Sequence, residues 1–199
     1  MTVSSVRKTS SERYTVTVDG EEIHSTLGVV TELRLFDGKN ISREQLDEIR
    51  LLSVRYLARD KAIEMISRRL MSTGELRKKL VEKGMDAETA DYCTGWLEEN
   101  HLMNDAGYAE AIVRHYSAKG YGAARIKNEF VKRLVSRDYW EDALSSLPES
   151  EDVIDRLISQ KLKDPDDRSQ VDRVAAMLYR RGYSWDEIRS ALNRFENTR

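Results

Sequence analysis

The sequence predicts a mainly α-helical protein of tandem three-helix repeats in an elongated, solenoid-like arrangement, with a short N-terminal β-hairpin. Three observations lead to this fold class. Apolar residues recur at helical spacing from Ser42 onward, the chain repeats itself after 50 residues, and only the first 40 residues alternate in the manner of strands. Stacked helical units each bury one face against a neighbour, so an elongated body is expected.

The first 40 residues are expected to form a short hairpin or a small sheet. The stretches YTVTVDGEEIH and GVVTELRLFDG alternate apolar and polar side chains, and each contains an Asp-Gly pair typical of tight turns. Ser42 and Gln45 then form a capping-box pair that opens the helical part. We therefore expect a tail and hairpin over residues 1–41, repeats one and two over 42–147, and a C-terminal helical repeat over 148–199.

The repeats appear when residues 62–97 are shifted forward by 50 positions without a gap. Apolar residues then fall on apolar residues, as Leu76 on Ile126 and Leu80 on Phe130. A further shift of 62 places three more apolar residues at equivalent positions: Leu178, Ile188 and Leu192. Because the chain ends before this copy could form a third helix, the helix predicted over 152–162 is expected to take that place by permutation.

The second helix begins differently in the middle copy. The other two copies begin it with capping boxes, which satisfy free backbone amides: Ser72 with Glu75, and Ser184 with Glu187. The middle copy has Gly122 and Arg125, and a cation there opposes the positive end of the helix dipole. Either Gly122 is a tolerable cap, or the open amides and Arg125 receive an anion from a partner. In the second case Arg125→Glu would keep or raise stability and weaken function.

Charge is uneven along the chain although it nearly balances overall. Lys and Arg total 33 against 35 Asp and Glu, and the net charge of -2 gives no general attraction to nucleic acid. Residues 50–83 hold ten basic and four acidic residues, whereas residues 141–155 hold six acidic and no basic ones. Arg77, Lys127 and Arg189 occupy one position in the three copies, so they form either a basic row or an ordinary solvated surface.

Basic side chains are the candidate contacts with a partner or nucleic acid. The set is Arg68, Arg69, Arg77, Lys78, Arg125, Lys127, Lys132, Arg133 and Arg189. No nucleophile and base can be paired, so no catalytic residue is predicted. The tryptophans are interpreted as core residues and Cys93 as a small buried residue. The three histidines lack metal-ligand spacing, so we expect neither a metal nor another cofactor.

The composition is typical of a soluble cytoplasmic protein. With 199 residues and 40% hydrophobic content, the chain is long enough for one large domain or two small ones. The N-terminal segment lacks the apolar run of a signal peptide, and no stretch approaches the roughly 20 apolar residues that span a bilayer. The single cysteine excludes a framework of intramolecular disulfides.

Four segments resemble, in order, the motifs of the RecX family of RecA regulators: RRLMSTGELRKKLVEKG, HLMNDAGYAEAIV, GYGAARIKNEFVKR and YRRGYSWDEIRSAL. The similarity covers roughly residues 55–195. It implies a fold of tandem three-helix repeats and binding within the groove of the RecA filament on single-stranded DNA. Such binding restrains filament growth, ATP turnover and strand exchange in recombination and the SOS response. The resemblance also implies a protein without chemistry of its own, and we expect the chain to be a monomer.

Two positions depart from the family pattern. Gly120, Tyr121 and Gly122 stand where the family tends to have Gly-Pro, and Leu134 stands where it often has glycine. A leucine in a left-handed cap costs about 1 kcal/mol or more, so the helix before Leu134 is expected to close in another way. Two other classes of protein remain open: a stand-alone DNA-binding helical module, and a scaffold that joins proteins through acidic residues 141–155.

Overall fold

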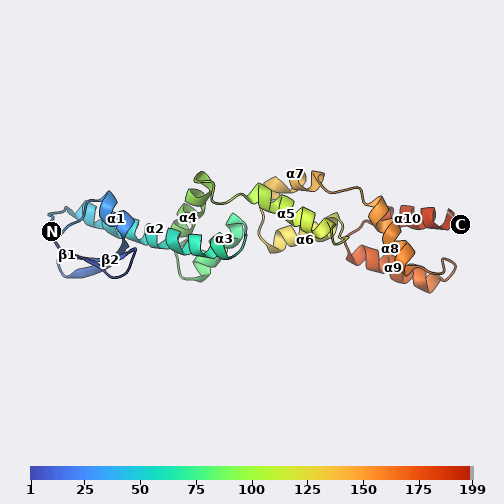
Figure 1. Ribbon diagram of the computed structural model, residues 1–199, viewed down its shortest axis with the longest axis horizontal. Helices are drawn as coiled ribbons and strands as arrows, with labels where there is room; N and C mark the ends of the chain where they lie inside the picture. The colour runs from blue at the N-terminus through green and yellow to red at the C-terminus, as the bar shows by residue number, and fades with distance from the viewer. Residues whose placement is uncertain (198–199) are drawn as a thin grey trace. The chain divides into compact units, whose positions relative to one another are not determined.

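The computed structural model describes residues 1–197, and the chain forms two compact units (Figure 1). Unit 1 consists of Met1–Leu70 and Leu76–Met103, and unit 2 of Met71–Glu75 and the chain from Asn104 onward. Helix is the main secondary structure in both. The elongated arrangement stays a prediction. Small-angle scattering tests it, because a compact chain of this length would have a radius of gyration of roughly 16–17 Å.

A three-stranded antiparallel sheet forms the N-terminal part of unit 1, so the small sheet, rather than a two-stranded hairpin, is the alternative that the structure adopts. Strands β1 (Val3–Lys8), β2 (Arg13–Val18) and β3 (Glu21–Thr26) pair in the order β1-β2-β3. Asp19 and Gly20 make the turn between β2 and β3, and both have positive φ. This is the two-residue hairpin turn that the Asp-Gly pair predicts.

The segment after the sheet is a helix and a loop, so the strand expected in GVVTELRLFDG is wrong. Thr26 ends β3 and caps helix α1 (Leu27–Glu32), where its side chain accepts a hydrogen bond from the Val29 amide at 3.5 Å. The loop that follows lies along the outer edge of β1, and the Gly38 amide donates to the Val3 carbonyl at 2.8 Å. The cap and the edge pairing both override the alternating pattern.

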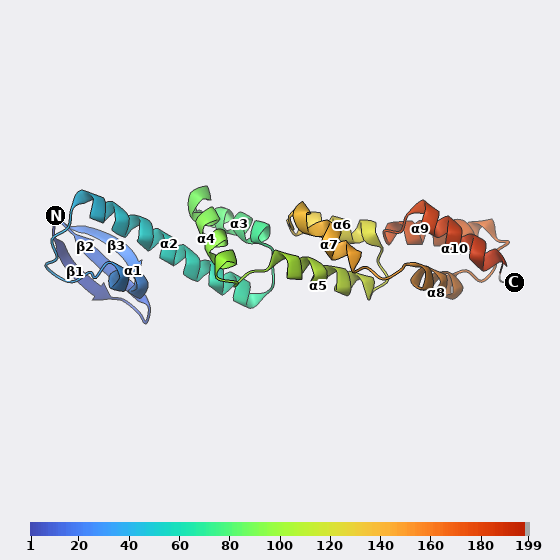
Figure 2. The ribbon, with the colours of Figure 1, turned by 90° about the horizontal axis from the view of Figure 1, so that it is seen from above.

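Helix α2 (Arg43–Arg68) packs its first half against the sheet (Figure 2). It begins with the predicted capping box, in which the Ser42 amide donates to Gln45 Oε1 at 2.9 Å and the Gln45 amide donates to Ser42 Oγ at 3.2 Å. Sheet, α1 and α2 share one apolar core, formed by Val3, Val16, Val18, Ile23, Val29, Leu35, Ile41, Leu46 and Ile49. A small sheet becomes stable through such packing on a helix.

Three-helix repeats make up the rest of the chain. The first contains the end of α2, α3 (Thr73–Glu82) and α4 (Ala87–Glu99). The second contains α5 (Asp105–Ser117), α6 (Ala123–Lys132) and α7 (Trp140–Ser145), with a 3-10 turn η1 (Arg137–Tyr139) before α7. The third contains α8 (Glu151–Lys161), α9 (Arg168–Arg180) and α10 (Trp185–Asn197). Repeats two and three each bury one apolar cluster to which all three of their helices contribute.

The third repeat keeps the helix order of the others, so the permutation expected from the shift of 62 is wrong. The second helix of every repeat ends at a residue with left-handed φ: Gly84 at +88°, Leu134 at +52° and Gly182 at +94°. The third copy therefore aligns with the second at a shift of 48, from 134 to 182, which places Leu178 on Phe130. Both shifts match apolar residues, and only the turn distinguishes them.

Leu134 adopts the left-handed conformation that its side chain disfavours. Its amide donates to the Val131 carbonyl at 3.1 Å, and the Val135 amide donates to the Phe130 carbonyl at 3.0 Å, so the chain closes tightly behind α6. The expectation that this helix closes in another way is therefore wrong. A strain of about 1–2 kcal/mol remains in the folded chain.

Candidate binding surface

Backbone carbonyls from the turn after α9 close the start of α6. The Gly122 amide donates to the Arg181 carbonyl at 2.9 Å, and the Ala124 amide donates to the Gly182 carbonyl at 3.1 Å. The Arg125 amide donates to the Gly122 carbonyl at 3.1 Å. Because these donors already have acceptors within the chain, the hypothesis that they stay open for an anion from a partner is wrong.

The glycines at this contact allow two backbones to meet directly. A Cβ on Gly122 would lie 2.5 Å from the carbonyl oxygen of Gly182, and a Cβ on Gly182 would lie well within 3.0 Å of the backbone nitrogen of Arg125. Gly182 also has the left-handed φ of +94°. The two glycines are therefore required by the contact between repeats two and three, which we name the α6–α9 joint (residues 119–125 and 181–183).

Side chains reinforce the α6–α9 joint. The buried Tyr183 hydroxyl donates to the Gly120 carbonyl at 3.1 Å, and burial raises the pKa of this phenol. Arg181 Nη1 donates to the carbonyls of Lys119 at 3.0 Å and Gly120 at 3.2 Å. The Tyr121 ring lies between two cations, with the guanidinium carbons of Arg125 and Arg181 at 5.8 and 5.5 Å from its centroid. Residues 120–122, which lack the family's Gly-Pro, thus bind the third repeat through hydrogen bonds and ring contacts.

A matching contact occurs at the start of α3, within unit 2. The Glu75 amide donates to Ser72 Oγ at 3.0 Å, so Ser72 caps the helix as predicted, and the same hydroxyl donates to the Arg133 carbonyl. A Cβ on Gly74 would lie 2.5 Å from the carbonyl oxygen of Leu134. We name this contact the α3–α6 joint (residues 72–74 and 133–134). It also depends on a glycine at the closest approach.

Arg125 and Arg133 flank a buried carboxylate on α6. Glu129 Oε1 lies 3.6 Å from Arg125 Nη2, and Glu129 Oε2 lies 3.5 Å from Arg133 Nε. Arg133 Nη1 also donates to the Tyr108 hydroxyl at 2.9 Å. Burial alone would raise the pKa of Glu129, but the Tyr116 hydroxyl and the neighbouring cations lower it below its usual range. Arg133 therefore holds the fold together, and Arg125 has an internal partner for its charge.

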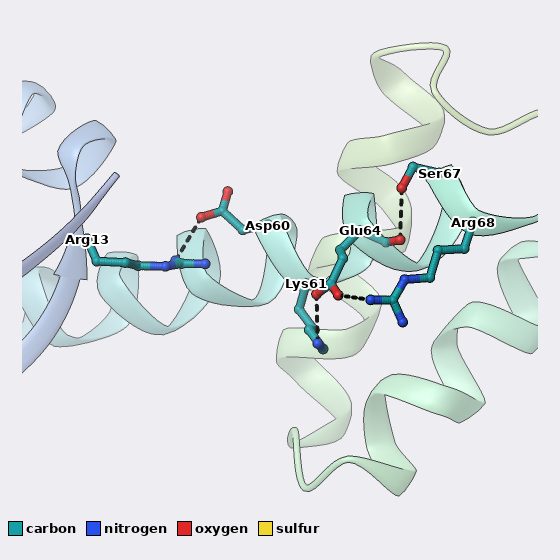
Figure 3. Close-up of polar contacts among 6 residues, drawn as sticks. All are labelled: Arg13, Asp60, Lys61, Glu64, Ser67 and Arg68. Atoms are coloured by element: carbon teal, nitrogen blue, oxygen red, sulfur yellow. Dashed lines mark hydrogen bonds and ion pairs between the residues drawn. The ribbon is translucent and has the colours of Figure 1, made fainter. Parts of the chain in front are cut away.

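In unit 1, the predicted cations are paired on the surface. Arg77 binds Asp91 through two nitrogens, joining α3 to α4, and the pKa of Asp91 is lowered by this hydrogen bond. Arg68 pairs with Glu64 one helical turn earlier, where Lys61 also donates to Glu64 at 2.7 Å (Figure 3).

Two further predicted cations of unit 1 make weaker contacts. Lys78 lies 3.8 Å from Glu82, also one turn away on α3. Arg69, the C-cap residue that follows α2, donates to the Leu70 carbonyl at 3.2 Å. The contacts of Arg68, Arg69 and Lys78 are exposed and of the kind that contributes little to stability, whereas the Arg77 pair is strengthened by its two hydrogen bonds.

The other three predicted cations are exposed on unit 2. Lys127 and Lys132 lie on the outer side of α6, while Arg189 lies on α10 and reaches Asp186 only at 3.9 Å. Arg77 and Lys127 share a position on the second helices of their repeats, but Arg189 lies on a third helix. The corrected alignment places Ala175 at this position, so a row of three cations is wrong.

Sequence reasoning missed a cluster of cations and aromatic rings between α2 and α4. The Arg59 guanidinium carbon lies 3.8 Å from the ring centroid of Tyr56 and 4.4 Å from that of Trp96, and Arg55 lies 4.4 Å from Tyr92. The signal was the spacing of two arginines four residues apart on a long helix. Below it Cys93 is buried as predicted, and burial raises the pKa of its thiol to about 11.

Trp185 contradicts the interpretation that all three tryptophans are core residues. It is 53% exposed and stacks on Tyr179, which is 55% exposed. The other two are partly buried, Trp96 beneath Arg59 and Trp140 beside Phe130. A sequence pattern gives the helical face of a side chain but not whether another element covers that face.

The repeats and the joints between them define a class of protein. Within residues 1–197 no cluster of three His, Cys, Asp or Glu side chains could hold a metal ion, and no helix there is long and apolar enough to cross a bilayer. Unit 2 presents two helical repeats with charged and aromatic surfaces joined through backbone contacts. This is a tandem helical-repeat protein, a class that typically binds other macromolecules.

Family comparisons identify which repeats these are. The models of the first, second and third three-helix domains of RecX match residues 58–97, 104–144 and 149–192. These matches cover more than half of the chain, and the protein belongs to the RecX family. The third match covers α8, α9 and the first part of α10 in that order, in agreement with the corrected alignment.

Curated relatives and solved structures agree with this assignment. "Regulatory protein RecX" of Caldanaerobacter subterraneus subsp. tengcongensis is 27% identical over 195 residues, which is 94% of this chain and 96% of the relative. That of Vibrio parahaemolyticus is 29% identical over 140 residues, 68% of this chain and 90% of the relative. A crystal structure of regulatory protein RecX shares the fold with a TM-score of 0.78 at 19% identity, covering 96% of this chain and 98% of the other. RecX from Lactobacillus salivarius gives 0.66 at 20% identity over 72% and 97%.

Proposed function

We propose that this protein binds the RecA filament on single-stranded DNA and restrains filament extension, ATP hydrolysis by RecA and strand exchange in recombination and the SOS response. One observation carries the proposal: three RecX domain models match the three helical repeats in order. The curated relatives are named regulatory proteins. We propose that the protein acts as a cytoplasmic monomer without catalysis or a cofactor of its own.

We propose that the contacts with the filament come from cations that the fold does not hold tightly. Lys127 and Lys132 are exposed on α6. The pairs of Lys78 and Arg189 are long and exposed, and Arg68 has a partner on its own helix. Exposed pairs contribute about 0–1 kcal/mol, so these side chains can exchange their partner for an acidic group of the filament at little cost.

The remaining cations are proposed to position the surface and to add charge to it. Arg77 and Arg133 donate hydrogen bonds to side chains of the same chain, and Arg69 donates to a backbone carbonyl. Arg125 keeps its side chain 45% exposed while pairing with buried Glu129. It therefore presents a cation to a partner from a fixed backbone, because the α6–α9 joint holds that part of the helix.

The test is the rate of ATP hydrolysis by RecA on single-stranded DNA in the presence of the purified full chain. We expect the rate to fall as the protein saturates. Lys127→Glu with Lys132→Glu should raise the concentration needed for half-inhibition roughly 5- to 30-fold, since charge-assisted contacts contribute about 1–2 kcal/mol. The matched control Arg114→Glu reverses an exposed cation on α5 and should leave that concentration unchanged. An unchanged RecA rate with saturating parent protein would contradict the proposal.

A further inference from the structure

Two aromatic rings lie exposed at the ends of the turn between α9 and α10. Tyr179, in the last turn of α9, and Trp185, the first residue of α10, stack with ring centroids 5.2 Å apart and planes 21° from parallel. Both rings are more than half exposed. Trp140, by contrast, donates its indole N–H to the Val135 carbonyl at 3.1 Å and is partly buried. Packing of the repeat does not account for the exposed pair.

The repeat alignment shows that this position is exposed and apolar in every copy. The residues equivalent to Tyr179 are Val131, which is 57% exposed, and Val81, which is 41% exposed. Trp185 corresponds to Arg137 in repeat two. The third repeat alone extends a single apolar side chain into a broad, flat aromatic surface, and exposed apolar surface of this kind often marks a contact with a partner.

Cations border the aromatic pair on both helices. Arg180 directly follows Tyr179 and is exposed, and Arg189 lies one helical turn after Trp185 on the same face of α10, with its side chain 72% exposed.

The acidic groups of this turn are either held elsewhere or weakly paired. Glu187 accepts hydrogen bonds from the hydroxyls of Ser150 at 2.6 Å and Ser184 at 2.7 Å. Asp186 is almost fully exposed and lies 3.9 Å from Arg189, a distance at which the pair contributes little. The flat rings are therefore flanked by two exposed cations, Arg180 and Arg189, which can contact an anionic ligand.

We infer that Tyr179 and Trp185 form a stacking platform for the bases of single-stranded nucleic acid, with Arg180 and Arg189 placed to contact the neighbouring phosphates. An aromatic face stacks on any base, and cations attract the phosphate backbone. Single strands fit because a duplex keeps the faces of its bases covered. The inference rests on the proposed function, whose filament contains single-stranded DNA, and adds a direct contact with the strand itself.

The test is fluorescence anisotropy of a labelled oligo-dT of about 20 nucleotides, titrated with the full chain at low salt without RecA. Trp185→Ala and Tyr179→Ala should each weaken binding about 5- to 100-fold, while Trp185→Phe, which keeps a ring, should weaken it much less. Val131→Ala removes the equivalent apolar side chain of repeat two and should bind like the parent. Equal binding by Trp185→Ala and the parent, or no binding by the parent, would overturn the inference.

Tryptophan emission and RecA inhibition, measured on the same samples, separate this inference from the proposed function. Oligo-dT should quench the emission of the parent and quench Trp185→Phe much less. If the parent binds oligo-dT but leaves the RecA rate unchanged, the proposed function fails and the platform stands. If Trp185→Ala loses RecA inhibition but binds oligo-dT like the parent, the pair docks a protein and the inference fails. Unchanged circular dichroism melts would show that each variant is folded.

Discussion

The α3–α6 joint and the α6–α9 joint bring equivalent backbone segments of successive repeats together, but with different hydrogen-bond donors. In the first, the Ser72 hydroxyl donates to the Arg133 carbonyl; in the second, the Gly122 amide donates to the Arg181 carbonyl at 2.9 Å. Ser72 and Gly122 are equivalent in the repeat alignment, as are the two arginines. One carbonyl acceptor is thus satisfied by a side chain in one joint and by the backbone in the other.

Glycine is also distributed differently between the two joints. The first has Gly74 in the helix and Leu134, in a strained left-handed conformation, in the turn. The second has Gly122 at the helix start and Gly182 in the turn, without that strain. A capping residue is therefore dispensable where another repeat supplies the acceptor, and the position that must be glycine is the one where a Cβ would meet the backbone.

The largest effect is expected for Gly182→Ala. The added Cβ would meet the backbone of Arg125, and overpacking typically costs about 1–3 kcal/mol in addition to about 1–2 kcal/mol for a left-handed alanine. Gly84→Ala is the matched control, because Gly84 has a similar φ but open space around it. Urea unfolding followed by circular dichroism should show the greater loss for Gly182→Ala. Equal losses would mean that the joint contact contributes nothing.

An intermediate effect is expected for Arg125→Glu, with the opposite sign to the one that the helix dipole alone predicts. The new carboxylate would lie one turn from buried Glu129 and would replace its cationic partner, so stability should fall by about 1–2 kcal/mol. The loss requires an ionised Glu129, whose pKa is lowered in the folded state, so it is fully present above the ordinary pKa of about 4.3 and disappears as pH falls through the lowered folded-state pKa. Melts at pH 7 and pH 3 should therefore show a large and a small difference from the parent. A variant as stable as the parent at pH 7 would restore the dipole interpretation.

The smallest effect is expected at Leu134, the strained residue of the α3–α6 joint. Leu134→Gly should raise stability by up to about 1 kcal/mol, because relief of the left-handed strain exceeds the added freedom of the unfolded chain. Leu134→Ala loses the same side chain but keeps the strain, so it should be less stable than Leu134→Gly. Thermal melts of the three proteins check the order. If Leu134→Gly is the least stable, packing by the leucine outweighs its strain.

Local features of the fold could be predicted from the sequence. The capping boxes at Ser42 and Ser184, the turn at Gly20 and the burial of Leu76 and Phe130 all depend on residues within a few positions of each other. The order of the repeats could also be recognised from motifs. These predictions succeed because helix periodicity and capping are properties of short segments.

Contacts between distant segments could not be predicted. The closure of α6 depends on carbonyls at positions 181 and 182, about 60 residues away along the chain, and no local pattern indicates them. The register of the third repeat cannot be predicted, because helical spacing fits its apolar residues at two shifts. The charge of each candidate cation can be read from the sequence, but its ion-pair partner cannot. The pairing of Arg125 and Arg133 with buried Glu129 could therefore not be predicted.

Hydrogen exchange at the amides of Gly122 and Ala124 tests most directly whether the turn after α9 closes the start of α6. The two amides donate to backbone carbonyls of residues 181 and 182. We therefore expect them to exchange as slowly as amides in the middle of α6, and to exchange much faster in Gly182→Ala. Exchange in the parent as fast as in an unstructured peptide would contradict the joint and return the helix start to an open anion site.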